Sequence, residues 1–333
     1  MRKTKGHKAL KIIGVILLVI IALIVAMFIK AALTPAVPAD YEKSVLTGGE
    51  IEAKYLQNGS YFVSYIEVEA DERLGKYEIY YPDDISSVER KYPAIVVSNG
   101  TGIKASKYKA VFEHFASWGF VVIGNEEENS WYGSSAEKSL NYLLECNADK
   151  DSFFYQKIDT DNIGSLGHSQ GGVGAISAVT NTAYSDMYKT VVAESPTNPE
   201  LADNLQWHYD ITKVQIPFLM VAGTGKFDAD TVIPLEKMDE MYDALDSAPI
   251  KAMARRTDTE HGYMLYSADG YVTAWFMWQL RGDEDAAKAF VGDMPELLEN
   301  ELYQDQRIDV EETNNISFNR SCIRYENIEL TAY

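Results

Sequence analysis

The sequence predicts a doubly wound α/β fold with a mostly parallel sheet. Short, wholly apolar runs such as Ala94–Ser98 and Phe120–Gly124 are typical of strands covered on both faces. Segments with helical spacing of apolar residues follow these runs, at 108–118 and 135–146. A glycine-rich strand-to-helix turn lies within 163–178, in the middle of the alternation. Such alternation places ligand-binding loops at the carboxyl ends of the parallel strands.

The remaining elements continue this pattern along the chain. Alternating apolar residues over 50–81 predict antiparallel strands that open the fold. Further strands and helices are expected at 190–193, 218–222, 251–254, 235–245, 270–280 and 286–290. We therefore place one α/β domain at 46–295 and an acidic, Asn-rich C-terminal tail at 296–333.

The first thirty residues differ from the rest of the chain. Residues 1–11 carry five basic side chains and no acidic one, and Ile12–Ile29 carries no charge. Eighteen helical residues span about 27 Å, close to the hydrocarbon thickness of a bilayer. We expect a cytoplasmic basic segment, an uncleaved single-pass signal anchor at 12–30 and a spacer at 31–45, which leaves the domain outside the cell membrane. Cleavage near Pro35–Ala39 is the alternative and would give a secreted domain.

Charge excludes some classes of partner. The first thirty residues hold six of the 30 Lys and Arg and none of the 50 Asp and Glu, so the remainder carries 24 basic against 50 acidic residues, a formal charge of −26. A surface of this sign does not neutralise phosphate groups, which argues against nucleic acid and against peripheral binding to anionic lipid. The sequence does not indicate an oligomeric state.

No metal or cofactor is predicted. No His, Asp or Glu cluster has metal-ligand spacing, and the two cysteines, Cys146 and Cys322, do not form a C-x-x-C or metal-binding pattern. In an extracellular domain these cysteines could form one disulfide, and two free buried thiols are an equally open alternative.

The glycine-rich turn has the form of a nucleophile elbow. Gly167-His168-Ser169-Gln170-Gly171 is a G-x-S-x-G pentapeptide between a short strand and a helix of small residues. The turn would lift the Ser169 hydroxyl clear of the sheet and point the helix N-terminus at an oxyanion. We expect side chains at either glycine to collide with neighbouring backbone. Ser169 is the candidate nucleophile.

A serine nucleophile needs a base, and one of the five histidines fits this role. In folds with such an elbow the order along the chain is Ser, then acid, then His. His261 follows both the elbow and an acidic loop, and it is the candidate base. The others are His7 on the cytoplasmic side, His114 on an amphipathic helix with a surface packing role, His168 turned away from the serine, and His208 before the acid strand.

The orienting acid should follow the strand at 218–222. Two aspartates, Asp228 and Asp230, lie in the loop there. We favour Asp230 because Pro234 follows it by four residues, and Asp228 is the alternative. The aspartate that is not the acid would cap the turn.

The oxyanion hole needs two backbone N–H groups. The residue after the nucleophile, Gln170, supplies one. The loop after the first parallel strand supplies the other, which we assign to Thr101 with Gly102 as the alternative.

Three aromatic residues are candidates for substrate binding, although each also fits a packing role. The segment from Glu194 to Ile216 is too short for a large lid, so we expect an open site. Trp131, Trp207 and Tyr263 would line it.

Residues from about 90 to 280 resemble an α/β-hydrolase of the dienelactone hydrolase, cutinase and polyester-hydrolase-like branch. The resemblance rests on Trp118–Ile123, Ile158–Gly172 and Asp230–Pro234. It implies the α/β-hydrolase fold and ester hydrolysis through a serine acyl-enzyme, without cutin or polyester as the implied substrate. Thr101 stands where cutinase-like enzymes usually have an aromatic residue, which implies a different acyl pocket.

The leading prediction is therefore a membrane-anchored extracellular carboxylic ester hydrolase that acts on a small-molecule or lipid-like ester. A peptidase or a lipid acyl hydrolase on the same triad is one alternative. A non-catalytic surface binding protein on a hydrolase fold is another.

Overall fold

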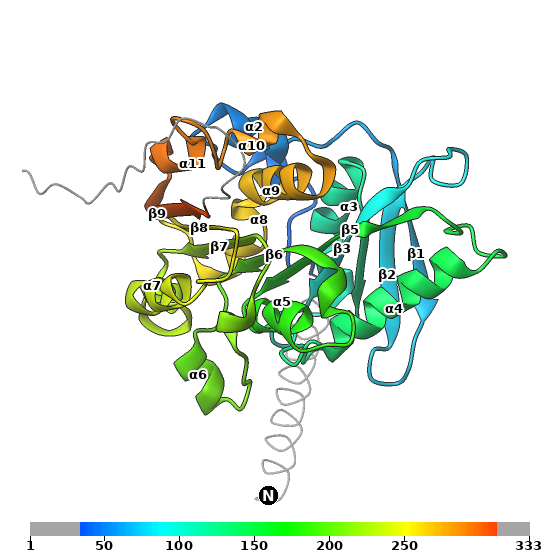
Figure 1. Ribbon diagram of the computed structural model, residues 1–333, viewed down its shortest axis with the longest axis horizontal. Coiled ribbons are helices and arrows are strands. Elements are labelled where there is room, and N and C mark those ends of the chain that lie inside the picture. Colours follow the sequence, from blue (N-terminus) through cyan, green and yellow to red (C-terminus); the bar gives the residue numbers. More distant parts are fainter. Residues whose placement is uncertain (1–33, 312–333) are drawn as a thin grey trace, which may run out of the picture.

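A computed structural model describes residues 34–311 (Figure 1). Within this range the strands form one sheet in the order β1-β2-β4-β3-β5-β6-β7-β8-β9. The strands are β1 Val63–Glu69, β2 Lys76–Pro82, β3 Tyr92–Ser98, β4 Val121–Asn125, β5 Ile158–His168, β6 Tyr188–Glu194, β7 Phe218–Gly223, β8 Ile250–Arg256 and β9 Tyr303–Val310. The central strands pair in parallel, whereas β1, β2 and β9 are antiparallel to their neighbours. The predicted α/β fold with a mostly parallel sheet is confirmed.

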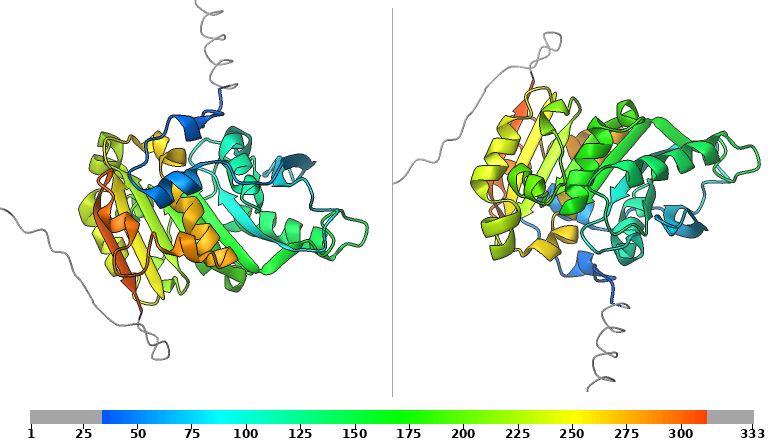
Figure 2. Two further views of the ribbon diagram at one scale, coloured as in Figure 1. Left: turned by 90° about the horizontal axis from the view of Figure 1, so that it is seen from above. Right: turned by 90° about the horizontal axis from the view of Figure 1, so that it is seen from below.

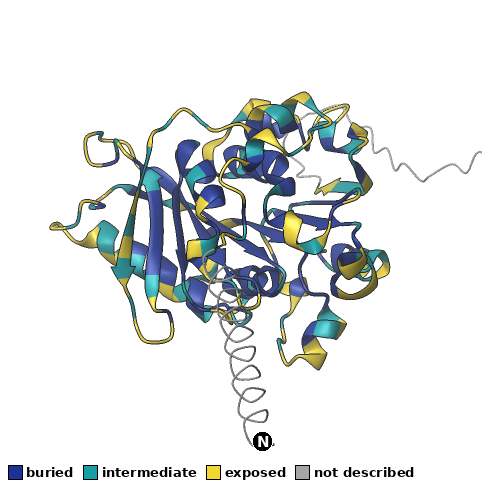
Figure 3. Ribbon diagram, turned by 180° about the vertical axis from the view of Figure 1, so that it is seen from behind, coloured by how far each residue is buried: buried dark blue, intermediate teal, exposed yellow. Residues whose placement is uncertain are grey.

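Helices cover both faces of this sheet (Figures 1 and 2). They are α2 Glu50–Leu56, α3 Lys109–Ser117, α4 Ser134–Ala148, α5 Gln170–Thr180, α6 Pro199–Asn204, α7 Leu235–Asp243, α8 Met264–Ser267, α9 Asp269–Arg281, α10 Glu284–Ala287 and α11 Glu296–Glu299. Residues of α2, α3 and α9 pack into one hydrophobic cluster, and residues of α4, α5 and α7 pack into a second. The strands between the two clusters are buried on both faces (Figure 3), as their apolar runs predict.

Helix α2 corrects the prediction that residues 50–81 form only strands. Glu50–Leu56 is the helix α2, which buries Tyr55 and Leu56 against the domain. The backbone amides of Ile51 and Glu52 donate to the carboxylate of Glu296 at 2.8 and 2.9 Å. These amides begin the helix and lack partners within it, so a distant side chain satisfies them.

The described part of the predicted spacer also packs against the domain. Residues 36–45, here called the N-terminal strap, bury Val37 and Tyr41 to 1% exposure each. The Tyr41 hydroxyl donates to Asp269 Oδ2 at 2.5 Å, and the Ala36 amide donates to the Lys107 carbonyl at 3.1 Å. Burial of a large aromatic side chain contributes about 2–3 kcal/mol of stability, and a spacer that stayed in solvent would lack this contribution. The spacer prediction is therefore wrong for these residues.

The C-terminal boundary of the domain also needs correction. Strand β9 pairs antiparallel with β8, so residues 303–310 belong to the sheet and not to a tail beginning at 296. A buried ion pair fixes this region, because Arg256 Nη1 donates to Glu52 Oε1 at 2.8 Å. The Tyr303 hydroxyl donates to the same oxygen at 2.9 Å. The helix expected at 286–290 is α10, one turn that begins two residues earlier.

Some predictions fall outside the described residues. The anchor at 12–30 and Cys322 are among them, so the anchor and the disulfide stay predictions. Cys146 lies on α4 and is partly buried. Between residues 34 and 311, every helix is too short or too polar to cross a bilayer.

Candidate active site

The elbow serine is held in a strained backbone conformation. Strand β5 ends at His168 and helix α5 begins at Gln170, so Ser169 alone makes the turn. Its φ of 59° and ψ of −123° lie in a region that L-residues rarely adopt. The Ser169 amide donates to the Glu194 carbonyl at 2.9 Å, and its carbonyl accepts from the Gly172 amide at 2.9 Å. These bonds fix the turn and the position of the serine.

Both glycines of the pentapeptide are required, as the sequence predicts. A Cβ atom on Gly167 would lie 1.9 Å from the Gly171 carbonyl oxygen. A Cβ atom on Gly171 would lie 2.1 Å from the Ser98 carbonyl oxygen. Backbone atoms cannot yield as a flexible side chain can, so the tight elbow depends on glycine at both positions.

His261 and Asp228 form a buried hydrogen-bonded pair at the carboxyl end of the sheet. His261 begins the turn η6 His261–Tyr263 after β8, and its Nδ1–H donates to Asp228 Oδ1 at 2.6 Å. Asp228 is fully buried, and its Oδ2 accepts from the Ser195 hydroxyl at 2.6 Å and from the Gly223 amide at 2.9 Å. With its proton held on Nδ1, the imidazole presents Nε2 as the acceptor nitrogen.

The prediction of Asp230 as the orienting acid is wrong, because the structure places Asp228 against His261. Both residues lie in the π-helical turn η5 Asp228–Val232. Residues two apart on a helical turn point to nearly opposite sides. Asp228 therefore points into the protein, and Asp230 is exposed to solvent.

His168 supports the loop that carries His261. Its Nε2–H donates to the His261 carbonyl at 2.8 Å, and the two ring centroids lie 4.5 Å apart. Burial, with the nearby His261 as a second cause, lowers the pKa of His168 to about 3, so its ring is neutral. The His168 ring therefore contacts His261, and its predicted orientation away from the Ser169 hydroxyl stays a prediction.

Two other histidines, His208 and His114, contact residues outside the proposed catalytic group. His208 is exposed, and its Nδ1 lies 2.8 Å from Asp203 Oδ1. His114 is buried to 1% exposure, which corrects its predicted surface role. Its Nε2 lies 3.1 Å from the Tyr55 carbonyl and 3.0 Å from the Thr273 hydroxyl.

Two of the backbone amides predicted for the oxyanion hole have no acceptor among residues 34–311. One belongs to Gln170, the first residue of α5, and the other belongs to Thr101. The Gly102 amide donates to the Glu128 carbonyl at 3.2 Å, so it is already engaged. This pattern favours Thr101 over Gly102 as the second oxyanion donor. The Gln170 side chain accepts from the Ser130 amide at 3.0 Å, which ties the elbow to the loop after β4.

The structure brings together two of the three predicted substrate-binding aromatics. The rings of Trp131 and Trp207 stack with centroids 5.8 Å apart. Tyr263 is 57% exposed and lies edge-on to Tyr266. Sequence reasoning missed Phe227, whose ring lies edge-on to His261 at 5.1 Å. Its position directly before the acid was the one available signal.

Two buried carboxyl groups behind the elbow were also missed. Glu194 ends β6 and is paired in register with His168, and Asp269 begins α9. Burial, and for Glu194 the neighbouring Asp269, raises the pKa of both carboxyl groups well above their usual values. Each group has one oxygen without a hydrogen-bond partner among the described residues. Neither group is hydrogen-bonded to His261, whose acidic partner is Asp228.

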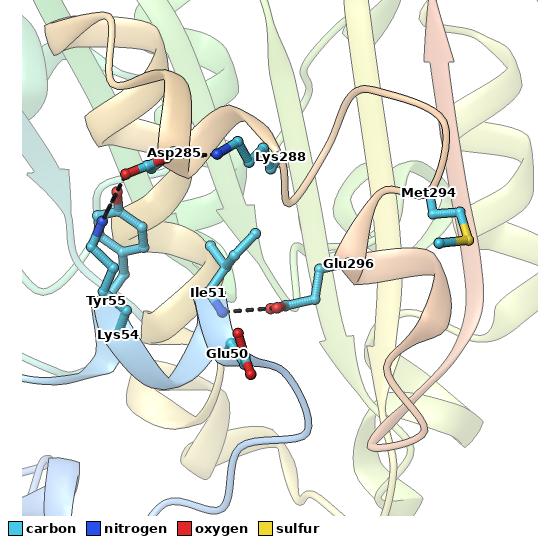
Figure 4. A pocket seen from close by; sticks show the side chains of 8 residues that line it. All are labelled: Glu50, Ile51, Lys54, Tyr55, Asp285, Lys288, Met294 and Glu296. Atoms are coloured by element: carbon cyan, nitrogen blue, oxygen red, sulfur yellow. Dashed lines mark hydrogen bonds and ion pairs between the residues drawn. The ribbon is translucent and has the colours of Figure 1, made fainter.

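A separate surface hollow of about 520 Å³ lies between α2, α10 and α11 (Figure 4). Its two lysines, Lys54 and Lys288, both pair with Asp285, at 3.7 and 2.7 Å. None of the residues discussed above as catalytic candidates lines this hollow. No group of three or more His, Cys, Asp or Glu able to hold a metal occurs within residues 34–311.

The comparisons with known proteins agree with the α/β-hydrolase fold. The model of a family described as PET hydrolase-like matches residues 47–303. A cutinase, est1 from Thermobifida alba, is 25% identical over 191 residues. That alignment covers 55% of this chain and 56% of the cutinase, so the chain matches just over half the length of this relative. The family match spans most of the described domain, including β1 to β8 and the whole candidate site, and the chain therefore belongs to the PET hydrolase-like family.

Proposed function

We propose that this protein is a serine hydrolase that cleaves carboxylic esters through an acyl-enzyme on Ser169. The observation that carries the proposal is the buried 2.6 Å bond between His261 Nδ1 and Asp228 Oδ1, at the same edge of the sheet as the strained elbow. A base oriented by an acid and a serine raised on an elbow are the parts that this chemistry needs. Membership of the PET hydrolase-like family and similarity to a cutinase support ester hydrolysis.

The proposed reaction assigns one role to each group. His261 Nε2 takes the Ser169 proton as the hydroxyl oxygen attacks the ester carbonyl, and Asp228 stabilises the resulting imidazolium. The Gln170 and Thr101 amides hold the tetrahedral oxyanion, where one such donor is typically worth about 3 kcal/mol. His261 then returns the proton to the departing alcohol. A water molecule repeats the sequence on the acyl-enzyme and releases the acid.

The reaction scheme uses only protein groups and water, and we propose no cofactor. The substrate proposed is a small-molecule or lipid-like ester. The stacked Trp131 and Trp207 and the exposed Tyr263 are proposed to border it.

We also propose that residues 12–30 anchor the domain to the outside of the cell membrane. The uncharged run and its basic flank support this location. Protease added to intact cells should then remove the domain from the membrane fraction. Release of the domain into the medium with a new N-terminus near Asp40 would show cleavage instead.

The nucleophile is tested by active-site labelling. Ser169→Ala should abolish both labelling by a fluorophosphonate and hydrolysis of p-nitrophenyl esters, while the melting temperature of the domain is retained. Wild-type protein should be labelled at Ser169 and keep its activity in a chelator. Labelling or hydrolysis that persists in folded Ser169→Ala protein would contradict the mechanism.

A further inference from the structure

Phe227 is an apolar side chain that is about half exposed to solvent and contacts His261, the proposed base. It is 53% exposed and belongs to neither hydrophobic cluster of the core. Its ring lies edge-on to the His261 imidazole, with centroids 5.1 Å apart and planes at 88°. The His168 ring contacts the same imidazole at 4.5 Å and is buried. Phe227 is therefore the solvent-exposed ring in contact with His261.

The place of the base in the reaction indicates which part of a substrate would meet this ring. His261 Nδ1 is bonded to Asp228, so Nε2 carries the proton to the leaving group. Proton transfer requires the alcohol oxygen to lie within hydrogen-bond reach of Nε2. The alcohol side of the ester must then lie against the His261 imidazole. The acyl group, by contrast, is attached to Ser169 and lies toward the oxyanion amides.

We propose that Phe227 forms an apolar wall for the alcohol part of the ester and determines its selectivity. The proposal rests on the ester hydrolase function proposed above. The expected substrates are esters whose alcohol carries an alkyl or aryl group large enough to cover the exposed Phe227 ring. Burial of that ring by the alcohol removes apolar surface from water, a contact that a methyl ester cannot make.

The test compares esters of one acid that differ in the alcohol. Methyl, butyl and benzyl butyrate would be hydrolysed by the full-length protein and by Phe227→Ala and Phe227→Leu variants. Phe227→Ala should lower kcat/KM by about tenfold for the butyl and benzyl esters and by less than about twofold for the methyl ester. Phe227→Leu should retain most of the preference for the butyl ester, since it keeps an apolar side chain.

A matched control and a second measurement separate this role from others. Phe62→Ala removes another exposed phenylalanine, 87% exposed before β1, and should leave all three kcat/KM values unchanged. The three esters share one butyryl-enzyme, so the rate of its hydrolysis should be equal for all and unaffected by Phe227→Ala. An equal loss on all three esters would overturn the proposal, because it would show that Phe227 only positions His261.

The two proposals fail in distinguishable ways. If wild-type protein hydrolyses none of the esters and is not labelled at Ser169, the ester hydrolase function fails and the selectivity proposal with it. If Ser169 is labelled and the esters are cleaved, but Phe227→Ala leaves their ranking unchanged, only the role of Phe227 is overturned.

Discussion

Asparagine in place of Asp228 should disable the enzyme, whereas asparagine in place of Asp230 should not. Asp228 Oδ1 accepts from His261 Nδ1–H, and Oδ2 accepts from the Ser195 hydroxyl and the Gly223 amide. In the Asp228→Asn variant the new side chain offers one acceptor oxygen and one donor NH₂ group. If its oxygen faces His261, its NH₂ group faces the Gly223 N–H, and two donors oppose each other in a buried site. If it is flipped, its NH₂ group faces His261 Nδ1 and drives the proton to Nε2.

The flipped arrangement sets the expected magnitude. A proton on Nε2 leaves the imidazole unable to take the Ser169 proton, and the lost carboxylate no longer stabilises the imidazolium. In serine hydrolases of known mechanism this exchange costs about 10⁴-fold in kcat, or about 5 kcal/mol of transition-state stabilisation. Asp230 is exposed and makes no contact with His261, so Asp230→Asn should change kcat by no more than about twofold.

The assay is steady-state hydrolysis of a p-nitrophenyl ester by both variants, with thermal unfolding to confirm that each is folded. Active-site titration with a fluorophosphonate would show how far the reactivity of Ser169 follows the loss in kcat. The reverse ranking, with Asp230→Asn impaired and Asp228→Asn spared, would refute the assignment and restore the acid predicted from the spacing to Pro234.

Two further predictions concern stability. Tyr41→Phe leaves the buried Asp269 without its donor and should lower the free energy of unfolding by about 1–3 kcal/mol in urea titrations; an unchanged midpoint would mean that the strap does not hold this region. Burial lowers the pKa of His114 to about 4, below its unfolded value of 6.5. Between these values the unfolded chain binds a proton that the folded protein does not, so the free energy of unfolding falls as the pH is lowered from 6.5 toward 4. His114→Gln should therefore reduce the slope of the unfolding free energy against pH in that window by the equivalent of about one proton. An unchanged slope would contradict the lowered pKa of His114.

The sequence predicted the elbow and the base because their signals are local. Gly167 and Gly171 are needed for contacts within the turn itself, and His261 follows from chain order. The acid was mispredicted because spacing to a proline says nothing about which way a side chain points. A five-residue π-helical turn rotates Asp230 out to solvent and Asp228 in toward His261. Only the three-dimensional path of that loop distinguishes them.

The other errors share a different cause, namely stabilisation by distant residues. Helix α2 is capped by Glu296, which lies 245 residues from Ile51. Strand β9 has the polar sequence Tyr-Gln-Asp-Gln-Arg-Ile-Asp-Val, without the alternation that marks a half-buried strand. It forms because the edge of β8 is available and the buried Glu52–Arg256 pair lies beside it. Local pattern reasoning does not detect such partners.

The N-terminal strap fixes the point at which the polypeptide leaves the folded domain. A free spacer of fifteen residues would have a typical end-to-end distance of about 21 Å, whereas the burial of Val37 and Tyr41 ties the chain to the domain from the strap onward. With residues 12–30 in a bilayer, as proposed, the domain would be held close to the membrane surface. The enzyme would act on substrates close to the lipid surface. The packing of Tyr41 on the domain, and not the length of a flexible spacer, would limit the distance between the domain and the membrane.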